Sequence, residues 1–171
     1  MEDLGPIPLD SETKVAERPA DHEAELRLWL RLLTCTTLIE GEIRSRLRDA
    51  FDVTLPRFDL MAQLDKSQNG MTLGELSQRM MVSNGNVTGL AERLVASGHL
   101  ERRPSPSERR AQIVNLTAEG RRTFRGMART HENWIAEIFG GLSHDDMETL
   151  MQLLAKTKMS TRKAMNGGDA R

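Results

Sequence analysis

The stretch from residue 72 to residue 117 limits what this chain can fold into more than any other part of the sequence. Thr72 and Glu75 form a capping-box pair that starts a short helix, LGELSQRM. Ser83 then caps a second short helix, which stops at Gly98. The stretch therefore begins with two short helices in close succession.

A basic hairpin follows these helices directly. Residues 100–103 and 112–116 read as two strands, and the Pro-Ser-Pro-Ser segment between them fits a hairpin tip, because proline cannot join the hydrogen-bond ladder of a sheet. Arginine suits a narrow minor groove or phosphate oxygens, although a solvated hairpin with local ion pairs would have the same composition. The arginines cluster within nine residues: Arg102, Arg103, Arg109 and Arg110.

The helix after Ser83 has an apolar face and a polar face. The polar face begins with small uncharged residues, which can approach base edges closely, and an asparagine can pair with adenine through two hydrogen bonds. An amphipathic surface helix would have a similar stripe, but its combination with a basic hairpin is more specific than either part. The layout predicts a winged helix-turn-helix that binds DNA, in a mainly α fold with a small β-hairpin wing. The apolar stripe consists of Val87, Leu90, Ala91, Leu94 and Val95.

Charge is distributed unevenly along the chain. The net charge is −1, which by itself does not indicate a nucleic-acid partner. Residues 1–25 carry eight acidic and two basic residues, whereas residues 101–125 carry seven Arg and three Glu. Because a local patch matters for binding more than the total charge, the basic middle of the chain still favours DNA.

Long helical patterns flank the predicted DNA-binding lobe. Apolar residues recur at three- and four-residue steps from His22 to Ala50, and a second helix, capped by Thr117, runs from Ala118 to about Phe139. Helices of such length often pack against a partner subunit. We expect a flexible arm at 1–20, an N-terminal dimerisation helix at 21–55, a DNA-binding lobe at 56–117, C-terminal dimerisation helices at 118–160 and a frayed tail at 161–171.

Several classes of function are disfavoured. Cys35 is the only cysteine, which excludes an intrachain disulfide and a thiolate-rich zinc site, and we expect neither a cofactor nor a metal. No Ser-His-Asp, phosphate-loop or His-Glu-x-x-His pattern indicates an enzyme. No signal-peptide core or bilayer-spanning run is present, which predicts a cytoplasmic protein and no membrane partner. A protein-interaction module on the same fold is an alternative, against which the hairpin arginines argue.

The hairpin resembles the wing signature of the MarR family of bacterial regulators, which is an acid, any residue, an arginine, five residues, then Leu-Thr. The family usually has Asp at the first position, where this chain has Glu. The segments LPRFDLMAQL and VSNGNVTGLAERLVASGHLERR also look like family counterparts, and the resemblance covers about residues 25–158. In this chain the signature reads Glu108-Arg109-Arg110, AQIVN and Leu116-Thr117.

This resemblance implies a homodimer that binds a palindromic operator in double-stranded DNA, usually as a repressor. The helix after Ser83 would lie in the major groove and Arg109 at the minor groove, while Glu108 and Arg110 brace the wing. Many relatives carry Arg where this chain has Gly89. The residues expected at the DNA are Ser83, Asn84, Asn86, Thr88, Arg93, Arg103, Arg109 and Arg110.

The resemblance also implies release of the DNA by a small molecule bound between the dimerisation helices and the DNA-binding lobe. The chain is most similar to the branch that controls aromatic-acid (hydroxycinnamate) catabolism, so the expected effector is an aromatic acid or its coenzyme A thioester. Each expected ligand residue, taken singly, is explained better by a place in the core. The expected ligand-binding residues are His22, Trp29, Leu33, Phe58, Met61, Met127, His131 and Trp134.

Cys35 offers an alternative, redox-sensing mode of control. It lies in the sequence among Leu32, Leu33 and Leu38, which predicts a buried and therefore inert thiol. Peroxide-sensing relatives pair their reactive cysteine with tyrosines, and this chain has no Tyr. Both observations disfavour a redox role.

Overall fold

The computed structural model describes residues 22–67, 69–104 and 112–167. Its internal contacts divide the chain into two units at the step from His131 to Glu132, which lies inside helix α6. The first unit holds the helix-turn-helix and the sheet, and the second holds the end of α6 and helix α7. Each unit is described by itself.

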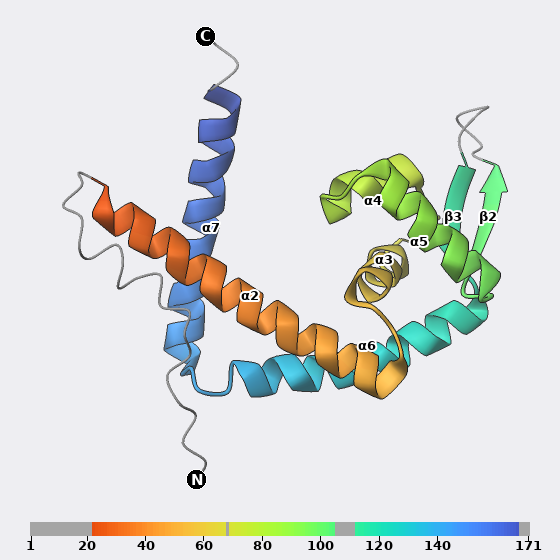
Figure 1. Cartoon of the computed structure of the whole chain (residues 1–171), viewed down its shortest axis with the longest axis horizontal. Helices are drawn as coiled ribbons and strands as arrows, with labels where there is room; N and C mark the ends of the chain where they lie inside the picture. Colours follow the sequence, from red (N-terminus) through yellow and green to blue (C-terminus); the bar gives the residue numbers. More distant parts are fainter. Residues whose placement is uncertain (1–21, 68, 105–111, 168–171) are drawn as a thin grey trace. The chain divides into compact units, whose positions relative to one another are not determined.

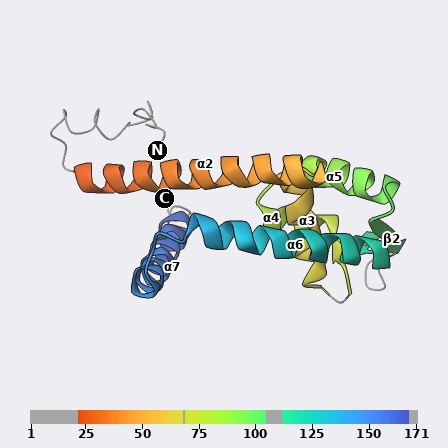
Figure 2. The same cartoon turned by 90° about the horizontal axis from the view of Figure 1, so that it is seen from below.

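The first long helix, α2, spans Glu23–Phe51 and is drawn as a long straight rod in Figure 2. Glu-to-Arg pairs four residues apart support it, because such pairs face each other on a helix surface. It ends at Asp52, whose backbone adopts the left-handed conformation with φ 53. The ion pairs join Glu23 to Arg27, Glu40 to Arg44 and Glu42 to Arg46.

Three shorter helices follow and gather into one cluster beside the sheet (Figure 1). They are α3 (Leu55–Asp65), α4 (Leu73–Met80) and α5 (Asn84–Ala96). The predicted capping box starts α4: the Thr72 hydroxyl accepts the Glu75 amide at 3.2 Å, and the Glu75 carboxylate accepts the Thr72 amide at 2.7 Å. The Thr72 amide and the Thr72 hydroxyl both donate to the Glu75 carboxylate, which lowers the pKa of Glu75.

The sheet has three antiparallel strands in the order β1-β3-β2, with β2 at Leu100–Pro104 and β3 at Gln112–Leu116. The third strand, β1 (Met71–Thr72), was not predicted, because two residues are too short to show an alternating pattern. Pro104 extends β2 beyond the predicted end, which an edge strand tolerates.

The core of the first unit lies among α3, α4, α5 and β3. The end of α2 and the first half of α6 cover it, through Ile43 and Leu47 on one side and Phe124 and Met127 on the other. Burial of this apolar surface is the main force that holds the short helices together. Its fully enclosed side chains are Leu60, Leu64, Leu76, Val87, Ala91 and Val114.

Two further helices complete the chain, α6 (Ala118–Ile138) and α7 (His144–Gly167). Ser143 caps α7 by accepting the Asp146 amide at 3.1 Å. The expectation of a frayed tail from 161 onward was wrong as far as Gly167, because α7 continues to that residue. The Thr161 hydroxyl bonds the Thr157 carbonyl one turn earlier, and the Lys, Arg, Ala and Met residues around it favour helix.

Candidate nucleic-acid interface

The first turn of α5 is small, polar and exposed. Ser83 precedes the helix in an extended conformation, and its hydroxyl accepts the Asn86 amide at 3.4 Å. The Asn84 and Asn86 side chains are exposed, whereas Val87 and Ala91 on the opposite side are buried. The predicted division of this helix into an apolar and a polar face is therefore present.

The next turn of the same face carries Thr88 and Gly89. The Thr88 hydroxyl donates to the Asn84 carbonyl at 2.8 Å, so its proton is already used and its oxygen remains an acceptor. A Cβ built on Gly89 would meet no atom within 4 Å. Arg93, one turn further, is exposed. This side of α5 therefore has room for an approaching partner.

A hollow of about 330 Å³ lies beside this face of α5. Residues from the start of α3 and from the end of α4 and the turn after it form its other wall. The hollow shows that the neighbouring helices do not pack tightly over this side of α5. It is lined by Pro56, Met80, Val82, Gly85, Asn86, Gly89, Leu90 and Arg93.

The arginines at the base of the hairpin are engaged by the protein itself. Arg103 donates to the Asn69 carbonyl at 2.7 Å, which ties β2 to the loop before β1. Arg102 lies 3.8 Å from the Glu92 carboxylate of α5. The structure thus gives Arg103 a structural contact that the sequence did not predict. The predicted wing residues Glu108, Arg109 and Arg110 lie outside the described residues.

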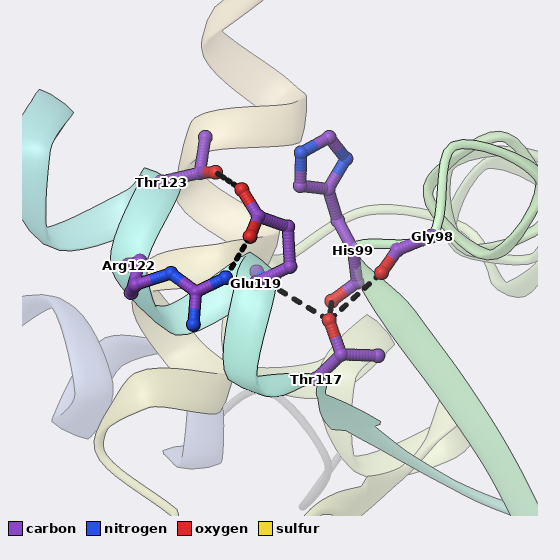
Figure 3. Close-up of polar contacts among 7 residues, drawn as sticks. Gly98, His99, Thr117, Glu119, Arg122 and Thr123 are labelled. Atoms are coloured by element: carbon purple, nitrogen blue, oxygen red, sulfur yellow. Dashed lines mark hydrogen bonds and ion pairs between the residues drawn. The ribbon is translucent and has the colours of Figure 1, made fainter.

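The start of α6 is fastened to the loop between α5 and β2 (Figure 3). The Thr117 hydroxyl accepts the Gly120 amide at 2.9 Å and approaches the Gly98 carbonyl at 2.8 Å and the His99 carbonyl at 3.3 Å. A Cβ on Gly120 would lie 2.1 Å from the His99 carbonyl oxygen, so only glycine permits this approach. The sequence indicated the Thr117 cap but not its contact with the loop.

Comparison with known proteins identifies the arrangement. The model of the MarR family matches residues 51–111. A crystal structure of a MarR family transcriptional regulator from Silicibacter pomeroyi is 30% identical, covers 84% of this chain and 99% of its own, and has a TM-score of 0.71. The chain belongs to the MarR family. It is a DNA-binding transcriptional regulator, and its relatives are regulators rather than enzymes.

Two other proteins are similar to this MarR-family chain over most of its length. The transcriptional activatory protein BadR of Rhodopseudomonas palustris is 28% identical over 159 residues, which are 90% of either chain. A mutant MarR from E. coli, crystallised with operator DNA, is 23% identical, covers 81% of this chain and 99% of its own, and has a TM-score of 0.71. At 23% identity, the likeness to the E. coli protein concerns the fold alone.

The predicted ligand-binding residues of this MarR-family chain fall into separate groups. Phe58, Met61 and Met127 are buried in the core of the first unit. The His131 ring lies 4.8 Å from the Phe58 ring, centroid to centroid. His22 is exposed and lies 4.0 Å from Glu25. Trp29 and Leu33 lie exposed on α2, and Trp134 belongs to the second unit. The structure thus joins Phe58 to His131 and leaves the α2 residues on the surface.

The expectation that the Cys35 thiol is buried was wrong. The apolar neighbours in the sequence predicted burial, yet the Cys35 side chain is exposed on α2. Leu33 and Leu38 are exposed too, at 45% and 49%, because this part of α2 contacts little of its own chain. Neighbours in sequence point in different directions around a helix, so they do not establish burial.

Two further findings concern the described residues alone. No helix among them is long and apolar enough to cross a membrane. Within the same residues, no group of three or more His, Cys, Asp or Glu side chains is placed to hold a metal ion.

Proposed function

We propose that this regulator binds a palindromic operator as a homodimer, represses adjacent genes and is released by an aromatic acid or its coenzyme A thioester. The observation that carries the proposal is the first turn of α5. It exposes Asn84 and Asn86 on a helix that is anchored from behind by buried Val87 and Ala91. Amide side chains on a helix that enters the major groove can read adenine.

The hairpin supplies the second part of the proposed interface. Arg103 fixes its base through the Asn69 carbonyl, and we place Arg109 in the minor groove, with Glu108 and Arg110 bracing the tip. Arg93 would contact phosphate from α5. A helix in one groove and an arginine in the next hold the protein in register on the duplex.

Exposed apolar residues on both long helices support the homodimer. On α2, Leu26, Trp29 and Leu33 share a helical face and are 46%, 57% and 45% exposed. On α7, Leu150 and Leu154 lie one turn apart and are 39% and 42% exposed. Apolar surfaces of this kind mark sites of association. A second copy of the chain would cover them and set the spacing of two recognition helices.

The aromatic effector is proposed from the ring cluster of the first unit. Phe58 packs against Phe124 at 5.3 Å and against His131 at 4.8 Å, centroid to centroid. Aromatic rings favour an aromatic guest, and a protonated histidine can pair with its carboxylate. Trp29 and Leu33 on α2 would contribute apolar surface.

The direction of regulation is proposed as repression, because a dimer that covers an operator excludes polymerase from an overlapping promoter. The relative BadR is named an activatory protein. A reporter assay of the neighbouring genes must therefore register both a rise and a fall in expression. Deleting the gene should raise expression from its neighbours. A fall in expression would assign activation.

The DNA proposal is tested by a mobility-shift assay on the sequence upstream of the gene, with random DNA as competitor. Asn86→Ala should weaken operator binding and leave binding to random DNA unchanged. Arg109→Ala should weaken operator binding and reduce the salt slope by about 1.8, the value for two lost cationic contacts, one in each protomer. An interaction module would not bind the operator even at low salt.

The effector proposal is tested by titrating hydroxycinnamic acids and their thioesters against the protein–operator complex. Release by one of these compounds, weakened by His131→Ala, is the expected result. If none of them releases the protein at saturating concentration, the aromatic-acid assignment is wrong while the DNA-binding proposal stands.

A redox response through Cys35 is the second candidate, favoured by the exposure of that side chain. Under this candidate, peroxide releases the wild-type protein from DNA and leaves the Cys35→Ser variant bound. Equal resistance of the two proteins to peroxide eliminates it.

A further inference from the structure

An ionic cluster connects the end of α3 with α6. Asp65 is the last residue of α3, and its Oδ1 atom is buried without a hydrogen-bond donor in the described part of the chain. Two guanidinium groups of α6 lie nearby instead, with Arg121 Nη1 at 3.6 Å and Arg125 Nε at 3.7 Å. A carboxylate oxygen withdrawn from water is costly unless positive charge compensates it, so these arginines stabilise Asp65, whose side chain is 23% exposed, in place.

Arg121 also reaches the sheet. Its Nη2 donates to Asn115 Oδ1 at 3.0 Å, and the same oxygen accepts the Leu116 amide at 3.0 Å. Asn115 is a buried polar residue of β3, the central strand, and stands opposite Glu101 of β2. One guanidinium group therefore bridges α3 and the strand that carries one side of the wing.

The side chains of Arg125 and Arg122 are more exposed than that of Arg121. The Arg125 side chain is 65% exposed, against 27% for Arg121. Arg122 is 72% exposed and pairs with Glu119, one turn away on the same helix. Exposed pairs of this kind contribute little to stability. Arg121, by contrast, is half-buried and contacts both α3 and β3.

We propose that Arg121 is a positioning residue for DNA recognition. Its guanidinium bridges Asp65 and Asn115, and so fixes the wing strands relative to α3 and to the start of α6. The Thr117 hydroxyl and Gly120 fix the same end of α6 to the loop after α5. The wing and the recognition helix are thereby held in one orientation, in which both fit one DNA site. The inference rests on the proposed contact of the wing with the minor groove.

The planar fork of arginine is essential to this role. Lysine retains the charge beside Asp65, but its single ammonium group cannot satisfy Asp65 and Asn115 with arginine's geometry. Arg121→Lys should therefore preserve folding and lower operator affinity by about tenfold, while affinity for random DNA is unchanged. Arg122→Lys, the matched control on the same helix, should leave both affinities unchanged.

A double-mutant cycle with Arg109→Ala separates positioning from a merely structural role. If Arg121 acts through the wing, Arg121→Lys has little further effect once Arg109→Ala has removed the wing contact. Additive losses, or equal losses on operator and random DNA that follow the melting temperature, would overturn the inference. Unchanged operator affinity in Arg121→Lys would overturn it as well.

Two further observations complete the test. Asp65→Asn removes the anionic partner of Arg121 and keeps the shape of the side chain, so it serves as a second variant if Arg121→Lys does not fold, and the same loss of discrimination is expected. Amide hydrogen exchange in β2 and β3 should be faster in either variant than in the Arg122→Lys control.

Failure of the wild-type protein to select any operator would contradict the proposed function itself. Specific wild-type binding with no effect of either variant would contradict the positioning role alone.

Discussion

Gly89 shows at the scale of one residue how the proposed DNA-reading face of α5 can be altered. A Cβ at this position meets nothing within 4 Å, so a side chain can leave the helix here without moving its neighbours. Glycine in a helix interior costs about 1 kcal/mol relative to a good helix former. The residue therefore limits the stability of α5 and, in the proposed complex, the contact of α5 with DNA.

Gly89→Arg should bind the operator more tightly and steepen the salt slope by about 1.8, the value for two added phosphate contacts, one in each protomer. Gly126→Arg is the matched control, because Gly126 also lies in open space, on α6. The measurement is fluorescence anisotropy of labelled operator over a salt series. Equal slopes for the two variants would contradict the placement of α5 at the DNA.

Met81 occupies the turn between α4 and α5 in a left-handed conformation, with φ 55, and is 90% exposed. This conformation is unfavourable for a residue with a Cβ. Met81→Gly should stabilise the protein by about 0.5–1 kcal/mol, measured by urea unfolding. Asp52→Gly, at φ 53, should gain less, because aspartate tolerates this conformation better. A loss of stability in Met81→Gly would show that the side chain packs in solution.

The residues that could be predicted from sequence are those that act over a short distance in the chain. The caps at Thr72, Ser83 and Thr117 bond amides three residues later, so spacing alone reveals them. Arg103 bonds Asn69 and Arg121 approaches Asp65, and no local pattern indicates such distant pairs.

At the scale of the elements, α6 depends on a glycine in its first turn. Gly120→Ala would place a Cβ 2.1 Å from the His99 carbonyl oxygen, and the backbone there cannot move without displacing β2 or α6. We expect a loss of about 1–3 kcal/mol in the free energy of unfolding, together with weaker operator binding.

Gly126→Ala provides the comparison within the same helix. Its Cβ meets nothing within 4 Å, so the substitution should stabilise α6 by about 1 kcal/mol. Urea unfolding should therefore give a lower free energy of unfolding for Gly120→Ala and a higher one for Gly126→Ala than for the wild-type protein. The same sign for both would show that α6 does not approach the His99 loop in solution.

Elements with a clear repeating pattern were predicted well, and the others were not. Apolar spacing indicated α2 and α6 to within a few residues, because a long amphipathic helix repeats its pattern many times. Strand β1 has two residues and forms only because β3 is beside it. The length of α7 was underestimated, because its last turns are exposed and carry no apolar stripe to mark the end.

At the scale of the whole molecule, the proposed homodimer determines whether two recognition helices can meet one operator. Light scattering should give twice the chain mass of 19.2 kDa at micromolar concentration. Leu150→Gln with Leu154→Gln should give the single chain mass and lose operator binding, because both side chains are exposed on one face of α7.

Lys156→Gln with Lys163→Gln is the control for this dimer prediction, because these residues are exposed and lie on the opposite face of α7. A wild-type mass of one chain would contradict the homodimer. A dimer that persists in the double leucine variant would exclude this face of α7 from the contact.

Reading of the operator by α5 is tested most directly by a hydroxyl-radical footprint on the DNA upstream of the gene. A homodimer should protect two half-sites related by a two-fold axis, with centres about one helical turn, about 10 bp, apart. Protection should disappear with Asn86→Ala and persist with Gly126→Ala. Uniform protection of all sequences, or protection that Asn86→Ala leaves intact, would contradict the claim that α5 reads the operator.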